Sequence, residues 1–174
     1  MSHRVPSVGA RSMLQNGIAR NHFSVEAEPP QRRLLAWRER VGHVIDVLHS
    51  SSDLGKPFSA SIDRYELGGL VFTDCRSDAM SLDRSLARIS RDGVRDFAFH
   101  VFLEGGVQDV RVRSLSRTGA PFAATVLALD MGQPVRMWRT GCRVLTLFVP
   151  PEIVEEVFPD PETIHGRVIQ EMTP

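Results

Sequence analysis

The feature that most constrains the fold is a series of short apolar or alternating segments over residues 58–149, separated by Gly, Pro, Asp and Ser. Segments of about six residues, spaced roughly 8 to 15 residues apart, are typical of strands in a β-sandwich or barrel. We therefore expect a mainly β protein. The predicted strands are residues 59–67, 70–75, 97–103, 107–112, 122–129, 135–139 and 143–149.

Helices are predicted on either side of these strands and once between them. Apolar residues recur at steps of three and four over 34–48, which predicts an amphipathic helix. A short helix is expected over 81–90 with Ser81 as its N-cap. A third is expected over 150–158, where a proline pair opens it and Pro159 stops it. Residues 1–33 lack such a period, so they are predicted to be a disordered or loosely packed leader before a domain at 34–174.

Composition excludes several classes of protein. The 174 residues are 42% hydrophobic and 24% charged, with 21 basic and 21 acidic side chains. This balance is that of a soluble globular domain, and it excludes a fully disordered, collagen-like or membrane-bundle chain. It also lacks the basic excess of a nucleic-acid-binding domain, although a local patch remains open.

The spacing of the cysteines and the lack of long apolar segments point to a cytoplasmic location. Cys75 and Cys142 lie far apart and form neither a CxxC pair nor a disulfide framework. No stretch has the length of a signal peptide or of a membrane-spanning helix. We expect a cytoplasmic protein with no membrane partner.

Motifs for catalysis and metal binding are missing from the sequence. The six histidines form no HxH, HxxxH or HExxH pair. There is no GxSxG nucleophile motif and no phosphate-binding loop. Cys142, beside Arg143, is either a thiol of lowered pKa or a half-buried residue at a strand start, and we favour the second. We predict no catalytic residues, no metal ligands and no cofactor, and hence no enzyme.

Four arginines at spacings of four, three and four would share one side of a continued helix. They are Arg84, Arg88, Arg91 and Arg95. Such a stripe could bind an anionic ligand or an acidic partner. Because aspartates interleave with it, an internally paired, solvated face is the interpretation that we favour.

Three residues are candidates for contact with a small molecule. His100 and Phe102 share one face of the predicted strand over 97–103, and that face mixes aromatic, imidazole and carboxylate groups. Trp138, beside Arg139 in a later strand, is the other large side chain that could stack on a ligand. Alternation does not say which face is inside, so a structural or surface role for His100 stays open.

Several short motifs then follow one another in order. They are Leu35-Ala36-Trp37-Arg38-Glu39-Arg40-Val41, Gly68-Gly69-Leu70, Arg84-x-x-x-Arg88-Ile89-x-Arg91, Asp96-Phe97-x-Phe99-His100-Val101-Phe102-Leu103-Glu104-Gly105-Gly106, Val126-Leu127-Ala128-Leu129-Asp130-Met131-Gly132-Gln133-Pro134, Leu145-Thr146-Leu147-Phe148-Val149-Pro150 and Ile164-His165-Gly166-Arg167-Val168. In this order, over about residues 34–170, the chain resembles the N-terminal AraC-binding-like domain of AraC/XylS-type transcription regulators.

The resemblance implies a cupin-like, jelly-roll-like β-barrel with flanking N-terminal and C-terminal helices. It implies an effector-sensing and dimerisation domain, a homodimer that binds an unidentified small-molecule effector and regulates transcription. In this family, DNA is contacted through a C-terminal helix-turn-helix domain.

The chain departs from the family pattern at its end. Fifteen residues follow Pro159, too few for a helix-turn-helix, so we expect no DNA-binding residues in this chain. The segment 121–124 also lacks the Gly-Asp usual before its strand. Two alternatives remain, a small cupin-like enzyme and a stand-alone dimerisation or interaction module.

Overall fold

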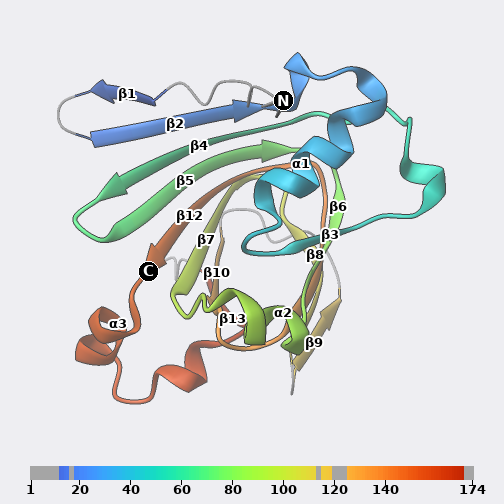
Figure 1. Cartoon of the computed structure of the whole chain (residues 1–174). Coiled ribbons are helices and arrows are strands. Elements are labelled where there is room, and N and C mark those ends of the chain that lie inside the picture. Colours follow the sequence, from blue (N-terminus) through green and yellow to red (C-terminus); the bar gives the residue numbers. More distant parts are fainter. Residues whose placement is uncertain (1–11, 16–17, 113–114, 119–124, 171–174) are drawn as a thin grey trace.

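Two antiparallel β-sheets pack face to face in this computed structural model, which describes residues 12–15, 18–112, 115–118 and 125–170 (Figure 1). The larger sheet has the strand order β1-β2-β4-β5-β12-β7-β10-β13, and the smaller one the order β3-β6-β11-β8-β9. The cupin-like, mainly β fold is thereby confirmed. The two sheets form a sandwich and are not closed into a barrel.

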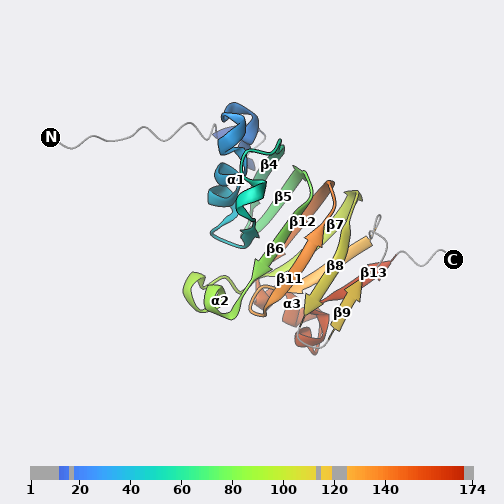
Figure 2. The same cartoon turned by 90° about the vertical axis from the view of Figure 1, so that its right-hand side faces the viewer.

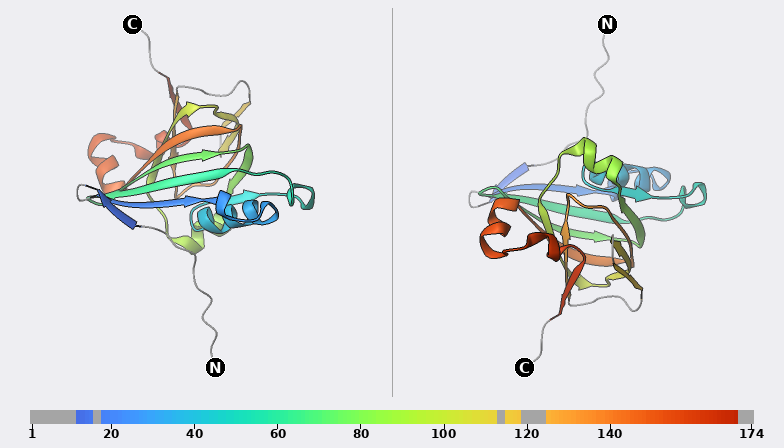
Figure 3. Two further views of the ribbon diagram at one scale, coloured as in Figure 1. Left: turned by 90° about the horizontal axis from the view of Figure 1, so that it is seen from above. Right: turned by 90° about the horizontal axis from the view of Figure 1, so that it is seen from below.

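The strands are β1 (Ser12–Gln15), β2 (Ile18–Ser24), β3 (Asp46–Leu48), β4 (Ala60–Leu67), β5 (Leu70–Ser77), β6 (Met80–Arg84), β7 (Phe97–Glu104), β8 (Val107–Val112), β9 (Leu115–Thr118), β10 (Thr125–Asp130), β11 (Val135–Arg139), β12 (Cys142–Val149) and β13 (Arg167–Gln170). The helices are α1 (Arg33–Val41), α2 (Leu86–Asp92) and α3 (Pro151–Val157), with short 3-10 turns η1 (Val25–Ala27), η2 (Pro30–Arg32), η3 (Ser51–Asp53) and η4 (Pro161–Ile164). Figure 2 shows α1 and α2 on the same side of the strands, and Figure 3 shows α3 apart from these two helices.

Six of the seven predicted strands are confirmed over their full length or to within a residue or two. The predicted strand over 122–129 is confirmed from Thr125 onward, and its first residues lie outside the described part of the chain. The predicted helix over 150–158 is confirmed as α3, with Pro151 in its first turn.

The predicted leader is wrong for the part of it that the structure describes. Strand β2 pairs with β4 from Ala19 to Ser24, and Val25 in the following turn is fully buried. Alternation of Ile18 with polar residues is too weak a signal to reveal a strand whose partner lies about 40 residues away. The folded domain therefore begins before residue 34, and residues 1–11 lie outside the described residues.

The predicted helix over 34–48 ends early, at Val41. A Cβ on Gly42 would lie 2.5 Å from the backbone oxygen of Arg38, and the chain turns there into β3, which pairs with β6. Leu34 and Trp37 form the buried face of α1, and Trp37 is 1% exposed. Apolar residues that continue the spacing of a helix can thus belong to the strand that follows it.

The helix predicted over 81–90 is also corrected. Residues up to Arg84 form β6, between β3 and β11, and the N-cap of α2 is Ser85, whose hydroxyl accepts from the Arg88 N–H at 3.2 Å. Gly93, with φ of +67°, ends α2 in the left-handed conformation.

The motif at 164–168 contacts several distant segments of the chain. The Asp130 N–H donates to His165 Nδ1 at 3.1 Å, and the other ring nitrogen lies 3.3 Å from the Pro134 oxygen. Gly166 has φ of +80°, and a Cβ there would lie 2.7 Å from Val112 Cγ2. These contacts attach β13 to β10.

Candidate ligand-binding cavity

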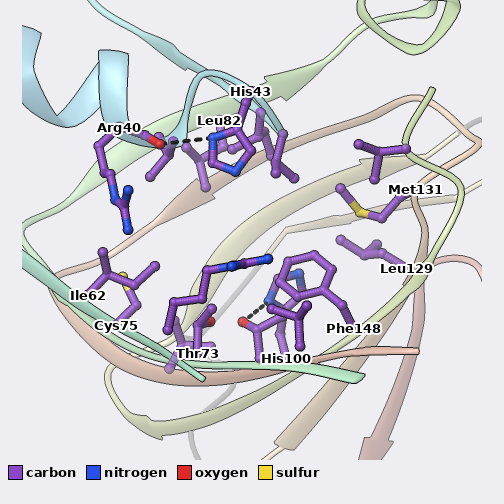
Figure 4. Close-up of a pocket in the computed structure, with 18 of the residues that line it drawn as sticks. Arg40, His43, Ile62, Thr73, Cys75, Leu82, His100, Leu129, Met131 and Phe148 are labelled. Atoms are coloured by element: carbon purple, nitrogen blue, oxygen red, sulfur yellow. Dashed lines mark hydrogen bonds between the residues drawn. The ribbon is translucent and has the colours of Figure 1, made fainter. Parts of the chain in front are cut away.

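A cavity of about 510 Å³ lies between the two sheets, beneath α1 and the segment that follows it (Figure 4). Its wall is largely apolar, with Ile62 and Phe148 from the large sheet and Leu82 from the small one. Leu129 and Met131 complete that wall. Both the volume and the apolar lining are typical of small-molecule sites.

A row of polar side chains crosses the floor of the cavity on the large sheet. Strand register places Asn21 opposite Arg64, Arg64 opposite Thr73, Thr73 opposite Thr146 and Thr146 opposite His100. The row therefore spans β2, β4, β5, β12 and β7, and all five residues line the cavity. Side chains two residues away on each strand face the same side.

Apolar side chains flank this polar row. On one side, register aligns Ile62, Cys75 and Val144, and on the other it aligns Val71 with Phe148. A ligand in the cavity would therefore meet a polar strip between two apolar ones. Such a surface suits a molecule that is itself partly polar and partly apolar.

His100 is the polar residue furthest along the row. Nδ1 of its ring lies 2.8 Å from the Thr146 hydroxyl oxygen (Figure 4). Burial, together with the positive charge of Arg139, lowers the pKa of His100 to about 3, so the ring is neutral at pH 7. Its Nε2 has no protein partner among the described residues, which leaves it available to a ligand.

Arg139 enters the cavity wall from the small sheet. Alternation along β11 turns Val135, Met137 and Arg139 inward, and Arg139 is only 6% exposed. Its Nη2 donates to Met80 Sδ at 3.6 Å, while its Nε has no partner in the described part of the chain. The guanidinium also interacts with the thiol of Cys75, whose pKa burial raises to about 11.

The α1 side of the cavity is positively charged. Figure 4 shows Arg40 and His43 across the cavity from His100, and His43 is exposed. Burial lowers the pKa of Arg40, and the nearby charge of Arg64 lowers it further. Burial likewise lowers the pKa of His43, and three arginines around it act in the same direction. On this side of the cavity the positive group is therefore Arg40, whereas the lowered pKa of His43 favours its neutral form.

The three predicted contact residues have different positions. His100 lines the cavity, whereas Phe102 is 1% exposed within the core and does not line it. Trp138 is 38% exposed on the outer face of β11, because its neighbour Arg139 points inward. The sequence interpretation overlooked Arg139. The signal was that Met137 and Val135, two and four residues before it, are apolar and share its face of the strand.

The predicted arginine stripe is wrong as a single helical face. Arg84 lies on β6 and is fully buried, while Arg88 on α2 pairs with Asp46. Arg91 and Arg95 are exposed and donate to backbone oxygens. Cys142 is the first residue of β12, as the favoured interpretation had it, but it is buried where that interpretation had it half-buried.

Two further searches cover the described residues only. They hold no group of three or more His, Cys, Asp or Glu side chains placed to bind a metal ion. None of their helices is long and apolar enough to cross a membrane.

Fold and cavity together define a cupin-like sandwich with an internal, largely apolar cavity. No protein-family model and no curated protein sequence matches the chain. Among solved structures, the crystal structure of the AraC-like transcriptional activator CuxR matches with a TM-score of 0.77 and 20% sequence identity. The match covers 87% of this chain and 54% of that one, so the chain spans about half the length of CuxR. The chain has the fold of this part of an AraC-like activator, as the resemblance predicted.

Proposed function

We propose that this chain is the effector-sensing and dimerisation domain of an AraC-type transcription regulator, cytoplasmic and without enzymatic activity. The observation that carries the proposal is the cavity of about 510 Å³ with a polar row on its floor, in a fold shared with an AraC-like activator. An apolar cavity with a few converging polar groups is a binding site by default.

The position of α1 suggests how a ligand would act. Trp37 and Arg40 of α1 both line the cavity, and the segment after α1 contributes His43, Val44 and Ile45. Arg40 Nη2 donates to the Asn21 side-chain oxygen at 2.5 Å, which links α1 to the polar row. A ligand on that row would favour one position of α1 over another and so transmit binding to the rest of a regulator.

Dimerisation would use α3. The apolar face of α1 is occupied by its own sandwich, since Leu34 and Trp37 are buried. On α3, by contrast, Ile153 is 43% exposed, Val157 70% and Phe158 42%. A second copy of the chain would bury this apolar group. Sedimentation velocity of Val157→Glu tests this, because a dimer through α3 becomes a monomer and an unchanged dimer contradicts it.

Control of DNA would pass through a helix-turn-helix domain, attached to this domain or supplied by a partner. The domain described here would then bind the effector and pair two copies, while the other domain reads the operator. The chain's formal net charge of zero fits this division of labour.

The sensing role is tested by thermal unfolding of the chain in the presence of fractionated small molecules from cell extract. At least one fraction should raise the unfolding temperature. The variant Ile62→Trp places an indole in the cavity and should abolish that rise, while Val157→Glu should keep it. A rise that persists in Ile62→Trp, or no rise with any fraction, contradicts the sensing role.

A further inference from the structure

Arg139 brings into the cavity wall a positive charge that no described side chain neutralises. It is 6% exposed, and it forms no ion pair within the described residues. Its acceptor is the sulfur atom of Met80, the charge of Arg139 also acts on the thiol of Cys75, and sulfur is a weak hydrogen-bond acceptor. A buried charge in such surroundings is costly unless a counter-ion joins it.

The groups around Arg139 do not supply that counter-ion. His100 is neutral at pH 7, and the two other arginines that line the cavity, Arg40 and Arg64, are themselves cations. Glu66 is exposed and pairs with Arg64. Asp96 is the carboxylate among the described lining residues, and Arg139 forms no ion pair with it. The cavity therefore has an uncompensated positive charge.

The wall around Arg139 determines what a ligand must contain besides an anionic group. Most of the cavity surface comes from aliphatic, aromatic and thioether groups. They include Met137, two residues before Arg139, its strand partner Leu82, and Val144 on the large sheet. A free inorganic anion would leave this surface without a partner. The occupant must therefore join one anionic group to an apolar body.

We infer that the effector is an amphipathic monocarboxylic acid, whose carboxylate pairs with Arg139 and whose apolar body lies between Leu82, Met131 and Phe148. This inference rests on the proposed function, because it names the chemical class that the sensing cavity would take. The planar guanidinium matches a carboxylate with two parallel N–H···O bonds.

A single negative charge fits better than a phosphate monoester. Such an ester carries about −1.5 to −2 charges at pH 7. One guanidinium and a neutral imidazole at this end of the cavity would leave part of that charge desolvated and unpaired. His100 can add one neutral hydrogen bond to a carboxylate: its Nε2–H donates while the Thr146 hydroxyl donates to Nδ1.

Isothermal titration calorimetry of the full chain tests the class directly. The probes are octanoate, dodecanoate, 3-phenylpropionate and 4-phenylbutyrate, each beside its primary amide, together with octyl phosphate. At least one acid should bind at least about 30-fold more tightly than its amide, because the amide leaves the Arg139 charge unpaired. Octyl phosphate should bind more weakly than octanoate.

Two substitutions on the same strand separate Arg139 from a general charge effect. Arg139→Met should weaken binding of the acid about 30-fold or more and leave binding of the amide unchanged. Arg136→Met removes one charge from the outer face of β11, where Arg136 pairs with Asp83 at 2.9 Å, and should change acid binding less than twofold. Arg139→Lys keeps the charge and should retain part of the preference for the acid. Circular dichroism establishes that each variant is folded.

The inference is overturned if acid and amide bind equally, if Arg139→Met binds the acid as the unmodified chain does, or if no acid binds. A neutral extract component that stabilises the chain, but not Ile62→Trp, would overturn the acid class and leave the sensing role standing. If the extract fractions also give no stabilisation, the sensing role falls with it.

Discussion

Two buried arginines, Arg84 on β6 and Arg139 on β11, lie on adjacent strands of the small sheet and have opposite surroundings. Arg84 is fully buried, and all of its hydrogen-bonding directions find oxygen acceptors. Nε donates to the Met131 oxygen at 2.7 Å, and both Nη atoms reach the Asp92 carboxylate, at 2.6 and 3.1 Å. The backbone oxygens of Val44 and Val94 accept the remaining bonds.

Arg139 has none of these partners. Its charge faces sulfur atoms, a neutral histidine and a cavity. One sheet thus contains an arginine that ties the loops around α2 together and an arginine whose partner is missing. A buried charge with every donor satisfied holds a structure in place, whereas a buried charge without an ion pair is the observation on which the proposed acid site rests.

The largest effect is expected at Arg84. Arg84→Met removes the closest ion-pair partner of Asp92, whose side chain is 9% exposed, and removes the bonds that the Met131 and Val44 oxygens accept, while the Val94 oxygen keeps its bond from Arg95. Breaking a buried ion pair on one side costs about 3–5 kcal/mol of unfolding free energy. Urea unfolding measures it, with Arg91→Met on the exposed face of α2 as the control, expected within about 0.5 kcal/mol. A loss below about 1 kcal/mol in Arg84→Met contradicts the structural role.

The second largest effect is the loss of stability at acidic pH that His100 causes. Because burial and Arg139 depress its folded-state pKa to about 3, the unfolded chain takes up the proton first as the pH falls through about 6.5. Stability is therefore full above that value and is lost toward pH 3, by up to about 1.4 kcal/mol per pH unit from this group. Urea unfolding at pH 7.5, 6 and 5 measures the slope.

The variant His100→Gln isolates that contribution, since glutamine can still hydrogen-bond the Thr146 hydroxyl and does not titrate. Its stability should change less between pH 7.5 and 5 than that of the unmodified chain. Burial also depresses the pKa values of His43 and His165, so part of the slope should remain. Equal slopes in the two proteins would contradict a neutral His100.

A smaller effect is expected when Arg139 is replaced in the unliganded chain. Arg139→Met removes a buried charge without leaving an unpaired acid behind, and methionine fills much of the same volume. The unfolding free energy should change by less than about 1 kcal/mol, or rise. A loss as large as that of Arg84→Met would show that Arg139 has a structural partner, and the contrast between the two arginines would collapse.

The smallest effect is expected for an arginine that solvent surrounds. Arg76 and Glu104 form an exposed pair with bonds of 3.1 and 3.2 Å on the outer face of the large sheet. Water and salt screen such pairs, so Glu104→Gln should change the unfolding free energy by less than about 0.5 kcal/mol. Urea unfolding in low and high salt checks this. A loss above about 1 kcal/mol would mean that exposed arginine pairs contribute as buried ones do.

Seven strands could be predicted because each carries its own alternation and ends in a glycine, proline or polar turn; they are β4, β5, β7, β8, β10, β11 and β12. Strands β2, β3 and β6 could not, because their pairing partners decide their structure. Residues such as Asp46 and Ser81 suit a helix as well as a strand, and β6 is a strand because β3 and β11 bond it on both sides.

The cavity was harder to predict than the fold. His100 could be named from the mixed face of its strand, but the row from Asn21 to His100 depends on the register of four strand pairs. The register of these strand pairs cannot be derived from the sequence alone. Trp138 was chosen for its size, whereas alternation with Val135 and Met137 favoured Arg139. Alternation along a strand therefore predicts which side chains face the cavity better than the size of a side chain does.

The most direct test observes both buried arginines in one ¹H–¹⁵N spectrum, where their Nε–Hε signals can be assigned with Arg84→Lys and Arg139→Lys. The acid that binds most tightly is titrated against its amide. We predict that the acid shifts the Arg139 signal and leaves the Arg84 signal in place, and that the amide shifts neither. An Arg139 signal that stays unmoved while the acid binds, or that the amide moves equally, would contradict the assignment of Arg139 as the ligand's charge partner.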